Sequence, residues 1–277
     1  MKKMPFLAAA GVFTLCCAAM PLRSASVTET YPDVDIVSIQ DQPMTMPGSL
    51  FRSIDPQEKF RAADSYTASL NVFLIQDRKS GVNALIDTGY GKAGGGLLKE
   101  LEKRKLGPED ISAVFITHIH PDHVGGLTAP DGTAAFPKAR IYIARREYEE
   151  WSRDASRAGL AKHLTPNREK IVLVDYDAEV KPYGLVPLYR PGHTPGHTVF
   201  RLKLSQEENK EKIIFFVGDI VHAAGLQIPH PEFCARFDMT PETAVKSRRE
   251  MLEKAEFWYG AHLPFPGIIR IENGLRK

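Results

Sequence analysis

The chain has 277 residues, of which 43% are hydrophobic and 25% are charged, as is usual for a soluble globular protein. This length is enough for one large domain or two small ones. The formal net charge of +2 is close to neutral, so composition does not indicate nucleic acid as a partner.

The first 26 residues differ in character from the rest of the chain. Lys2 and Lys3 precede an apolar run over 6–20, and small residues follow at 24–26. This pattern is typical of a secretory signal peptide, here cleaved after Ser26, and the run is too short for a membrane span. We therefore expect a periplasmic or secreted protein whose mature form, residues 27–277, has no membrane partner. An uncleaved anchor is the alternative.

Cleavage would remove three basic residues and no acidic one, which leaves 33 basic residues against 34 acidic ones. It would also leave Cys234 as the only cysteine and so exclude an intramolecular disulfide.

Apolar runs bounded by turn residues predict the order of strands and helices. Strands are expected at 34–40, 69–76, 82–86, 111–117, 140–143, 171–174, 185–189, 198–204, 213–217 and 257–261. Helices are expected at 97–105, 145–157 and 241–254. Two prolines and a glycine predict a loop over 42–48.

One arrangement repeats along this order. Asp87, His118, His193, Asp219 and His262 each come just after a predicted apolar strand. Strand ends on one edge of a sheet converge in space, so these side chains can meet although they are far apart in sequence.

The densest group of candidate ligands is Thr117-His118-Ile119-His120-Pro121-Asp122-His123. Residues two apart in an extended segment point the same way, so His118 and His120 can bind one ion. Pro121 then turns the chain and presents Asp122 and His123 to a second ion. The alternative is a polar loop whose histidines only cap nearby backbone.

Together with the strand-end residues there are seven ligands, five imidazoles and two carboxylates, which suit two ions that share a carboxylate and a water. Nitrogen and oxygen ligands without thiolate favour two zinc ions, with iron, manganese or cobalt as alternatives. The seven predicted ligands are His118, His120, Asp122, His123, His193, Asp219 and His262.

These motifs, with the Pro-Gly-His193-Thr-Pro-Gly-His197 loop and Gly218-Asp219, resemble those of the metallo-β-lactamase superfamily over nearly all of the mature chain. The resemblance implies an α/β fold, an αββα sandwich of two mixed sheets flanked by helices. It implies that one ion is held by three histidines (His118, His120, His193), the other by Asp122, His123 and His262, and that Asp219 bridges them. Asp87 and His197 are then expected to support the ligands from behind.

Within this superfamily, the segments 218–227 and 262–267 are similar to the branch that includes methyl parathion hydrolase and lactonase-like enzymes. Two ions would lower the pKa of a shared water to about 7, so that hydroxide is available as the nucleophile. Asp122 or Asp219 would pass a proton to the leaving group, and His222, Trp151 and Phe233 are candidates for the substrate pocket. His222 could instead be a capping residue, and the two aromatic residues could belong to the core.

The function predicted from these motifs is hydrolysis of a small ester-like substrate: a lactone, an aryl ester or a phosphotriester. The alternatives are a thioesterase of the glyoxalase II type, a mononuclear iron oxygenase on the same fold and a non-catalytic binding protein. The partner is then a small molecule, and only the family resemblance points to a homodimer.

Overall fold

The computed structural model describes residues 25–91, 95–153, 162–205 and 211–271. The predicted signal peptide lies outside these residues except for Ala25 and Ser26, which begin the first strand. Cleavage after Ser26 would therefore start the mature chain inside that strand.

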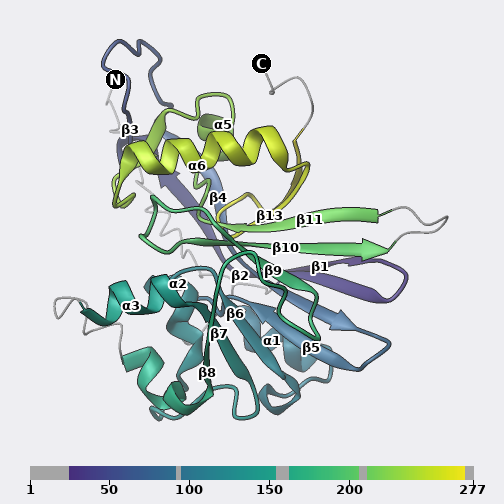
Figure 1. Ribbon diagram of the computed structural model, residues 1–277. Coiled ribbons are helices and arrows are strands. Elements are labelled where there is room, and N and C mark those ends of the chain that lie inside the picture. The colour runs from purple at the N-terminus through teal and green to yellow at the C-terminus, as the bar shows by residue number, and fades with distance from the viewer. Residues whose placement is uncertain (1–24, 92–94, 154–161, 206–210, 272–277) are drawn as a thin grey trace, which may run out of the picture.

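A seven-stranded sheet with the order β1-β2-β4-β5-β6-β7-β8 forms one layer of the molecule (Figure 1). Its strands from β1 to β5 pair antiparallel, and those from β5 to β8 pair parallel. Their bounds are β1 (Ala25–Thr30), β2 (Val34–Pro47), β4 (Ser65–Asp77), β5 (Val82–Ile86), β6 (Ala113–Ile116), β7 (Arg140–Ala144) and β8 (Ile171–Val174).

A five-stranded sheet with the order β14-β13-β11-β10-β9 forms the second layer, and in it β11 is parallel to β13. Its bounds are β9 (Leu185–Tyr189), β10 (Thr198–Ser205), β11 (Glu211–Gly218), β13 (Phe257–Gly260) and β14 (Ile268–Arg270). A separate pair joins β3 (Phe51–Ser53) to β12 (Phe233–Ala235).

Helices cover the outer faces of both sheets (Figure 1). On the side of the seven-stranded sheet these are α1 (Leu97–Lys103), α2 (Pro121–Val124) and α3 (Arg145–Arg153). On the other side α6 (Pro241–Lys254) covers the five-stranded sheet, with the short α5 (Ala224–Gln227) beside it. The predicted αββα sandwich is confirmed.

The layers follow from the period-two alternation of side chains along the strands. In β6, Val114 and Ile116 pack toward the helices, whereas Phe115 packs between the sheets against Phe200 of β10. Both faces of this strand are therefore buried, which is why its sequence is continuously apolar.

The loop predicted over 42–48 is wrong, because β2 continues to Pro47. This part of β2 pairs with β4 up to Pro47 opposite Ser65, past a bulge between Gln40 and Gln42. The described part of β1 pairs with β2 only as far as Gln40. Pro43 therefore has one strand neighbour among the described residues, and a proline is tolerated at such an edge.

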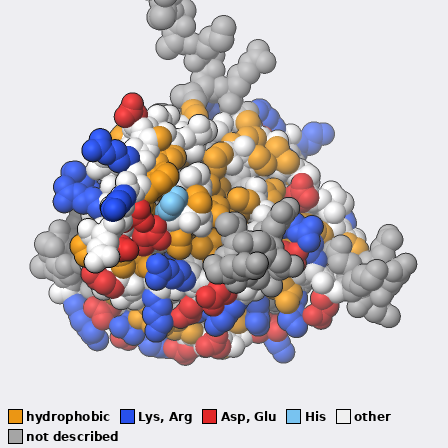
Figure 2. Space-filling view, turned by 90° about the horizontal axis from the view of Figure 1, so that it is seen from above, with side chains coloured by type: hydrophobic (Ala, Val, Ile, Leu, Met, Phe, Trp, Pro, Cys, Tyr) orange, Lys and Arg blue, Asp and Glu red, His pale blue; other side chains and the backbone are white. Residues whose placement is uncertain are grey.

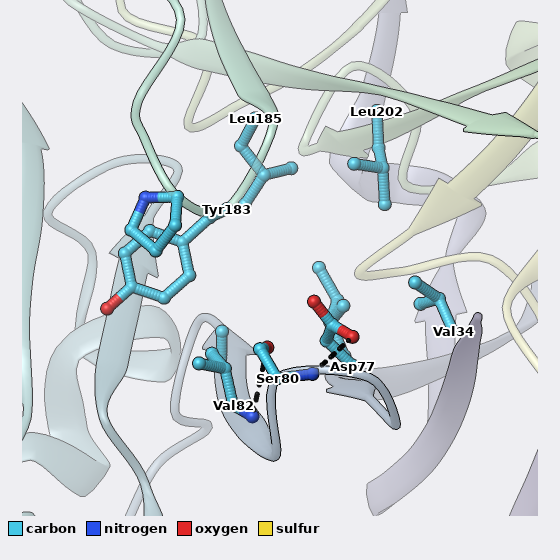
Figure 3. A pocket seen from close by; sticks show the side chains of 10 residues that line it. Val34, Asp77, Ser80, Val82, Tyr183, Leu185 and Leu202 are labelled. Atoms are coloured by element: carbon cyan, nitrogen blue, oxygen red, sulfur yellow. Dashed lines mark hydrogen bonds between the residues drawn. The ribbon is translucent and has the colours of Figure 1, made fainter.

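A cavity of about 50 Å³ opens between the sheets at the starts of β5 and β9, away from the strand ends that carry the candidate ligands (Figure 3). Its one carboxylate, Asp77, accepts hydrogen bonds from the backbone of Lys79 and Ser80 at 2.8 and 3.1 Å. The remaining lining is mostly apolar, so this cavity offers no chemistry of its own. Within the described residues no helix has the length and apolar character to cross a membrane.

Candidate metal centre

The segment from Thr117 to His123 connects the end of β6 to α2. Both the backbone N–H and the hydroxyl of Thr117 donate to the carboxylate of Asp87, at 2.8 Å each. Pro121 is the first residue of α2, a position whose backbone N–H has no partner within a helix. The start of this helix thus turns Asp122 and His123 toward the centre.

Three imidazoles meet on one side of the centre. Nε2 of His193 lies 3.1 Å from Nε2 of His118 and 2.9 Å from Nδ1 of His120, and the latter two nitrogens lie 3.0 Å apart. Two nitrogens bound to one tetrahedral zinc ion would lie about 3.4 Å apart, since each Zn–N bond is about 2.0–2.1 Å. The three nitrogens are therefore spaced as ligands of a single ion.

Asp122, His123 and His262 form the second side. Oδ2 of Asp122 lies 3.3 Å from Nε2 of His262 and 3.7 Å from Nε2 of His123. Asp219 stands between the two sides, with Oδ2 3.2 Å from Nε2 of both His193 and His262. Its Oδ1 lies 3.2 Å from Nε2 of His123. A carboxylate that bridges two ions needs this central position.

The chemistry of these donors fits metal. Nε2 of His123 and Oδ1 of Asp219 are buried and have no hydrogen-bond partner, a state that is costly unless an ion satisfies them. Donor atoms within 4.8 Å of one another form two main groups, one of His118, His120, His193 and Asp219 and one of Asp122, His123 and His262. The structure thus brings together all seven ligands predicted from the sequence.

The two predicted supporting residues also lie beside these ligands. Asp87 accepts a hydrogen bond from Nδ1 of His123 at 2.8 Å, which leaves Nε2 of that imidazole facing the centre. Nε2 of His197 accepts a hydrogen bond from the backbone N–H of Asp219 at 3.0 Å, and its Nδ1 donates to the carbonyl of Arg190 at 3.1 Å.

Glu147 of α3 is a supporting residue that the sequence analysis missed. Its carboxylate accepts hydrogen bonds from the backbone of Ile119 at 2.8 Å, the hydroxyl of Thr194 at 2.8 Å and the backbone of Gly196 at 2.9 Å. It therefore ties the first ligand segment to the loop of His193. Burial raises the pKa of Glu147, and these hydrogen bonds oppose the rise.

Asp238, which follows β12, was missed as well. Its Oδ1 accepts a hydrogen bond from Nδ1 of His193 at 2.9 Å, and its side chain is fully buried. The sequence signal for Asp238 was a lone carboxylate between two large apolar residues, Phe237 and Met239. The sequence signal for Glu147 was its four-residue spacing to Trp151, which places both side chains on one helix face.

The three candidates for the substrate pocket are all buried. His222 is fully buried with Nε2 3.1 Å from Oδ2 of Asp219, so it belongs to the centre itself and is not a cap. Trp151 is 9% exposed and its ring lies 5.5 Å from that of His120. Phe233 is 4% exposed and packs in a core cluster, which assigns it to the core.

Burial and neighbouring charges shift the pKa values of the cluster in opposite directions. Burial lowers the pKa of His118 well below its usual value and that of His120 to about 3. Burial also opposes protonation of His193 and His262, but Asp219 together with Asp238 beside His193 and Asp122 beside His262 outweighs it and raises their pKa to about 9 and about 10. Burial acts to raise the pKa of Asp219, yet the imidazoles hold it well below its usual value. The carboxylate thus stays ionised, as metal binding requires.

The model of one protein family, the metallo-beta-lactamase superfamily, matches residues 68–256. The chain belongs to this superfamily. The matched region contains six of the seven candidate ligands, and only His262 lies beyond it.

Several members of the metallo-beta-lactamase superfamily resemble the chain. It is 40% identical over 91 residues to an N-acyl homoserine lactonase of Bacillus sp, which is 32% of each protein. It is 31% identical over 195 residues to a hydroxyacylglutathione hydrolase of Pseudomonas savastanoi pv. phaseolicola (strain 1448A / Race 6), which is 69% of this chain and 61% of that protein. The chain thus spans about a third of the length of the two Bacillus lactonases it matches.

Solved structures of the superfamily share the fold over most of the chain. The hydrolase AbOPH has a TM-score of 0.75 at 26% identity and covers 90% of this chain and 93% of its own. AidC, a dizinc quorum-quenching lactonase, has a TM-score of 0.75 at 24% identity and covers 89% of this chain and 93% of its own. At this identity the similarity shows a shared fold.

The metallo-beta-lactamase centre has exposed apolar side chains next to it. The ring of Phe237 lies 4.7 Å from that of His222 and 5.9 Å from that of His193, and it is 38% exposed. Met239, whose backbone N–H donates to the carbonyl of His193 at 3.1 Å, is 40% exposed. Hydrophobic side chains also gather on the face that carries α5 and α6 (Figure 2).

Proposed function

We propose that this protein is a dinuclear metal-dependent hydrolase that cleaves a small lactone or related ester. The observation that carries the proposal is the division of seven donor side chains into two groups that meet at Asp219. A single tetrahedral ion needs four ligands, so this set supports two ions rather than one.

His118, His120 and His193 would hold one ion, Asp122, His123 and His262 the other, and Asp219 both. Nitrogen and oxygen donors favour zinc, with iron, manganese or cobalt as alternatives. When bound, such ions supply Lewis acidity and make hydroxide available as a nucleophile near neutral pH.

Asp122 is better placed than Asp219 to move a proton to the leaving group. The Asp122 side chain is 15% exposed, whereas that of Asp219 is 3% exposed and surrounded by imidazoles. A group that exchanges protons with a bound substrate must be within its reach. Asp122 therefore carries the proton in our proposal, and Asp219 positions the ions.

A lactone with an apolar substituent is the substrate that the surroundings support best. Phe237 lies against two imidazoles of the centre and exposes part of its ring, so an apolar group could pack there. The similarity to the N-acyl homoserine lactonases points in the same direction.

Thioester hydrolysis is the second candidate function. It is favoured by the similarity to hydroxyacylglutathione hydrolases, which extends over 69% of this chain in the case of the Pseudomonas savastanoi protein. A glutathione thioester carries carboxylates, whereas the Phe237 side chain next to the centre is apolar. The lactone is therefore our first choice.

The experiment is metal analysis of the purified protein, followed by turnover assays with lactones, aryl esters, thioesters and phosphotriesters. We expect about two zinc ions per chain and the highest kcat/KM for a lactone with an apolar chain. His163→Gln is the matched control, because His163 is in none of the donor groups of the centre. Two bound metals without turnover of any of these substrates would contradict the proposal, and a highest kcat/KM for thioesters would favour the second candidate.

We also propose that residues 1–26 direct the protein to the periplasm or beyond, on the basis of their basic start, apolar run and small residues. Cell fractionation of the producing bacterium would test this, with the shortened chain expected outside the cytoplasm. Full-length protein in the cytoplasm would contradict it.

A further inference from the structure

Arg248 lies on the buried face of α6 and is 1% exposed. Its Nε donates to the carbonyl of Ile220 at 2.8 Å, and its Nη1 donates to those of Pro231 and Phe233 at 2.6 and 2.8 Å. Its Nη2 lies 3.6 Å from Oδ2 of Asp238. An arginine cannot lose its charge in a protein, so this guanidinium is a permanent buried cation.

Two of its contacts lead to the metal centre from behind. Ile220 directly follows Asp219, the central carboxylate. Asp238 accepts the hydrogen bond from Nδ1 of His193. One side chain on α6 therefore contacts the supports of two candidate ligands that are 26 positions apart in the chain.

The two oxygens of Asp238 have different surroundings. Oδ1 accepts the hydrogen bond from Nδ1 of His193, whereas Oδ2 accepts the backbone N–H of Ala235 at 3.0 Å and lies beside the guanidinium of Arg248. The guanidinium of Arg248 and the N–H of Ala235, both beside Oδ2, favour the ionised form of this carboxylate. A carboxylate can only accept hydrogen bonds, so Nδ1 of His193 must carry the proton.

A proton on Nδ1 leaves the lone pair of His193 on Nε2, the atom that faces His118 and His120. The partner of the second nitrogen is what determines the tautomer and ring orientation of a metal-binding histidine.

We propose that Arg248 is a positioning residue of the metal centre, which acts through Asp238 on the tautomer of His193 and through Ile220 on the position of Asp219. This inference rests on the proposed function, because it takes His193 and Asp219 as ligands.

Asp238→Asn tests the tautomer with a side chain of the same shape. The amide oxygen would occupy the Oδ2 position, where the Ala235 N–H and the guanidinium both donate. The NH2 group would then face Nδ1 of His193 and move the proton of that imidazole to Nε2. We expect loss of one of the two zinc ions, with affinity for the lost ion reduced roughly 10–100-fold.

Arg248→Met removes the guanidinium but keeps a long side chain, and we expect a similar loss of zinc affinity. Because both changes act on His193, the loss of affinity in the double variant Arg248→Met with Asp238→Asn should be smaller than the sum of the two single losses. Arg248→Lys keeps the charge with fewer donors and should restore part of the affinity. Arg249→Met, at an exposed neighbour on the same helix, is the matched control and should bind zinc as the unsubstituted protein does.

The measurements are zinc affinity by chelator competition and the thermal unfolding midpoint of the metal-free protein. Unchanged zinc affinity in Asp238→Asn would overturn the proposal. A lower unfolding midpoint in Arg248→Met with unchanged zinc affinity would also overturn it, since Arg248 would then support only the fold. If Arg248→Met does not fold, Asp238→Asn decides alone.

Nitrogen-15 NMR gives a readout that does not depend on metal. Recorded on the metal-free protein at a pH at which the imidazole is neutral, it should show the proton on Nδ1 of His193 in the unsubstituted protein and on Nε2 in Asp238→Asn. The same tautomer in both proteins would overturn the proposal. An unsubstituted protein that shows the expected tautomers but binds no zinc would refute the proposed function instead.

Discussion

Cys234 is a buried thiol on β12, 4% exposed, with Sγ 3.3 Å from the carbonyl of Pro241. Burial, with the charge of Asp238 nearby, raises its pKa to about 11. The thiolate is the reactive form, and a raised pKa disfavours it at every pH below about 11. At pH 8 the thiolate fraction is on the order of 0.1%, compared with roughly a quarter for an unperturbed cysteine.

We therefore expect Cys234 in the folded protein to react with a disulfide reagent at pH 8 at least a hundredfold more slowly than in protein unfolded with guanidinium. The reaction of the folded protein should become faster as the pH rises toward 11. The measurement uses the Cys16→Ser/Cys17→Ser protein, so that the signal comes from one thiol. Equal rates in the folded and unfolded protein would show that the thiol is accessible.

At the level of residues, the sequence identified the candidate ligands but not all of the residues that support them. His118, His120, Asp122 and His123 form one short motif, and a local motif can be recognised without a fold. Asp238 lies 45 positions from the imidazole it supports, and nothing in its own neighbourhood reveals that partner.

Gly192 lets the loop before β10 approach the first turn of α6. Its φ is +125°, and a Cβ there would lie 2.1 Å from the backbone nitrogen of Ala244. The same loop accepts a hydrogen bond from the backbone of Thr240 at 2.8 Å. Gly192→Ala should therefore displace the adjacent His193, lower the free energy of unfolding by about 3 kcal/mol and reduce bound zinc.

Gly132→Ala is the control for this change, because Gly132 also has a positive φ, +86°, but no atom lies within 4 Å of its Cβ position. It should cost only about 1 kcal/mol and leave zinc content unchanged. Chemical denaturation with metal analysis measures both quantities. Similar losses in the two variants would mean that backbone strain alone, and not the approach of α6, accounts for the effect.

At the level of elements, apolar segments with turn residues at both ends were predicted well and irregular ones less well. β5, β8 and β9 have the expected bounds, because each is a short apolar run with turn residues around it. The second half of β2 was missed, since Pro43, Pro47 and Gly48 indicate a loop. Its pairing with β4 outweighs those local preferences.

The metal centre connects the two layers of the whole molecule. His118 and His123 belong to the segment after β6 in the seven-stranded sheet, whereas Asp219 and His262 follow β11 and β13 in the five-stranded sheet. Bound ions would therefore hold the sheets together at this edge, and binding only to the folded state stabilises that state.

Removing metal with a chelator should lower the free energy of unfolding by about 4 kcal/mol if zinc is present at a thousand times its Kd. For a chain of this size that corresponds to a decrease in Tm of roughly 10 °C. Thermal unfolding with and without chelator measures the decrease, and Asp219→Ala should show little further decrease when chelator is added. An unchanged Tm in the unsubstituted protein would contradict a metal that joins the sheets.

The sequence by itself determined the order of most strands of the sandwich, though not β1 and β14, and the identity of the candidate ligands. Apolar periodicity and short motifs depend on residues close together in the chain, and they carry this information. The tertiary structure decided which donors face each other, the contact of His222 with Asp219 and the roles of Glu147 and Asp238. These contacts join residues on different elements, and they exist only because two sheets pack face to face and bring their strand ends to one edge.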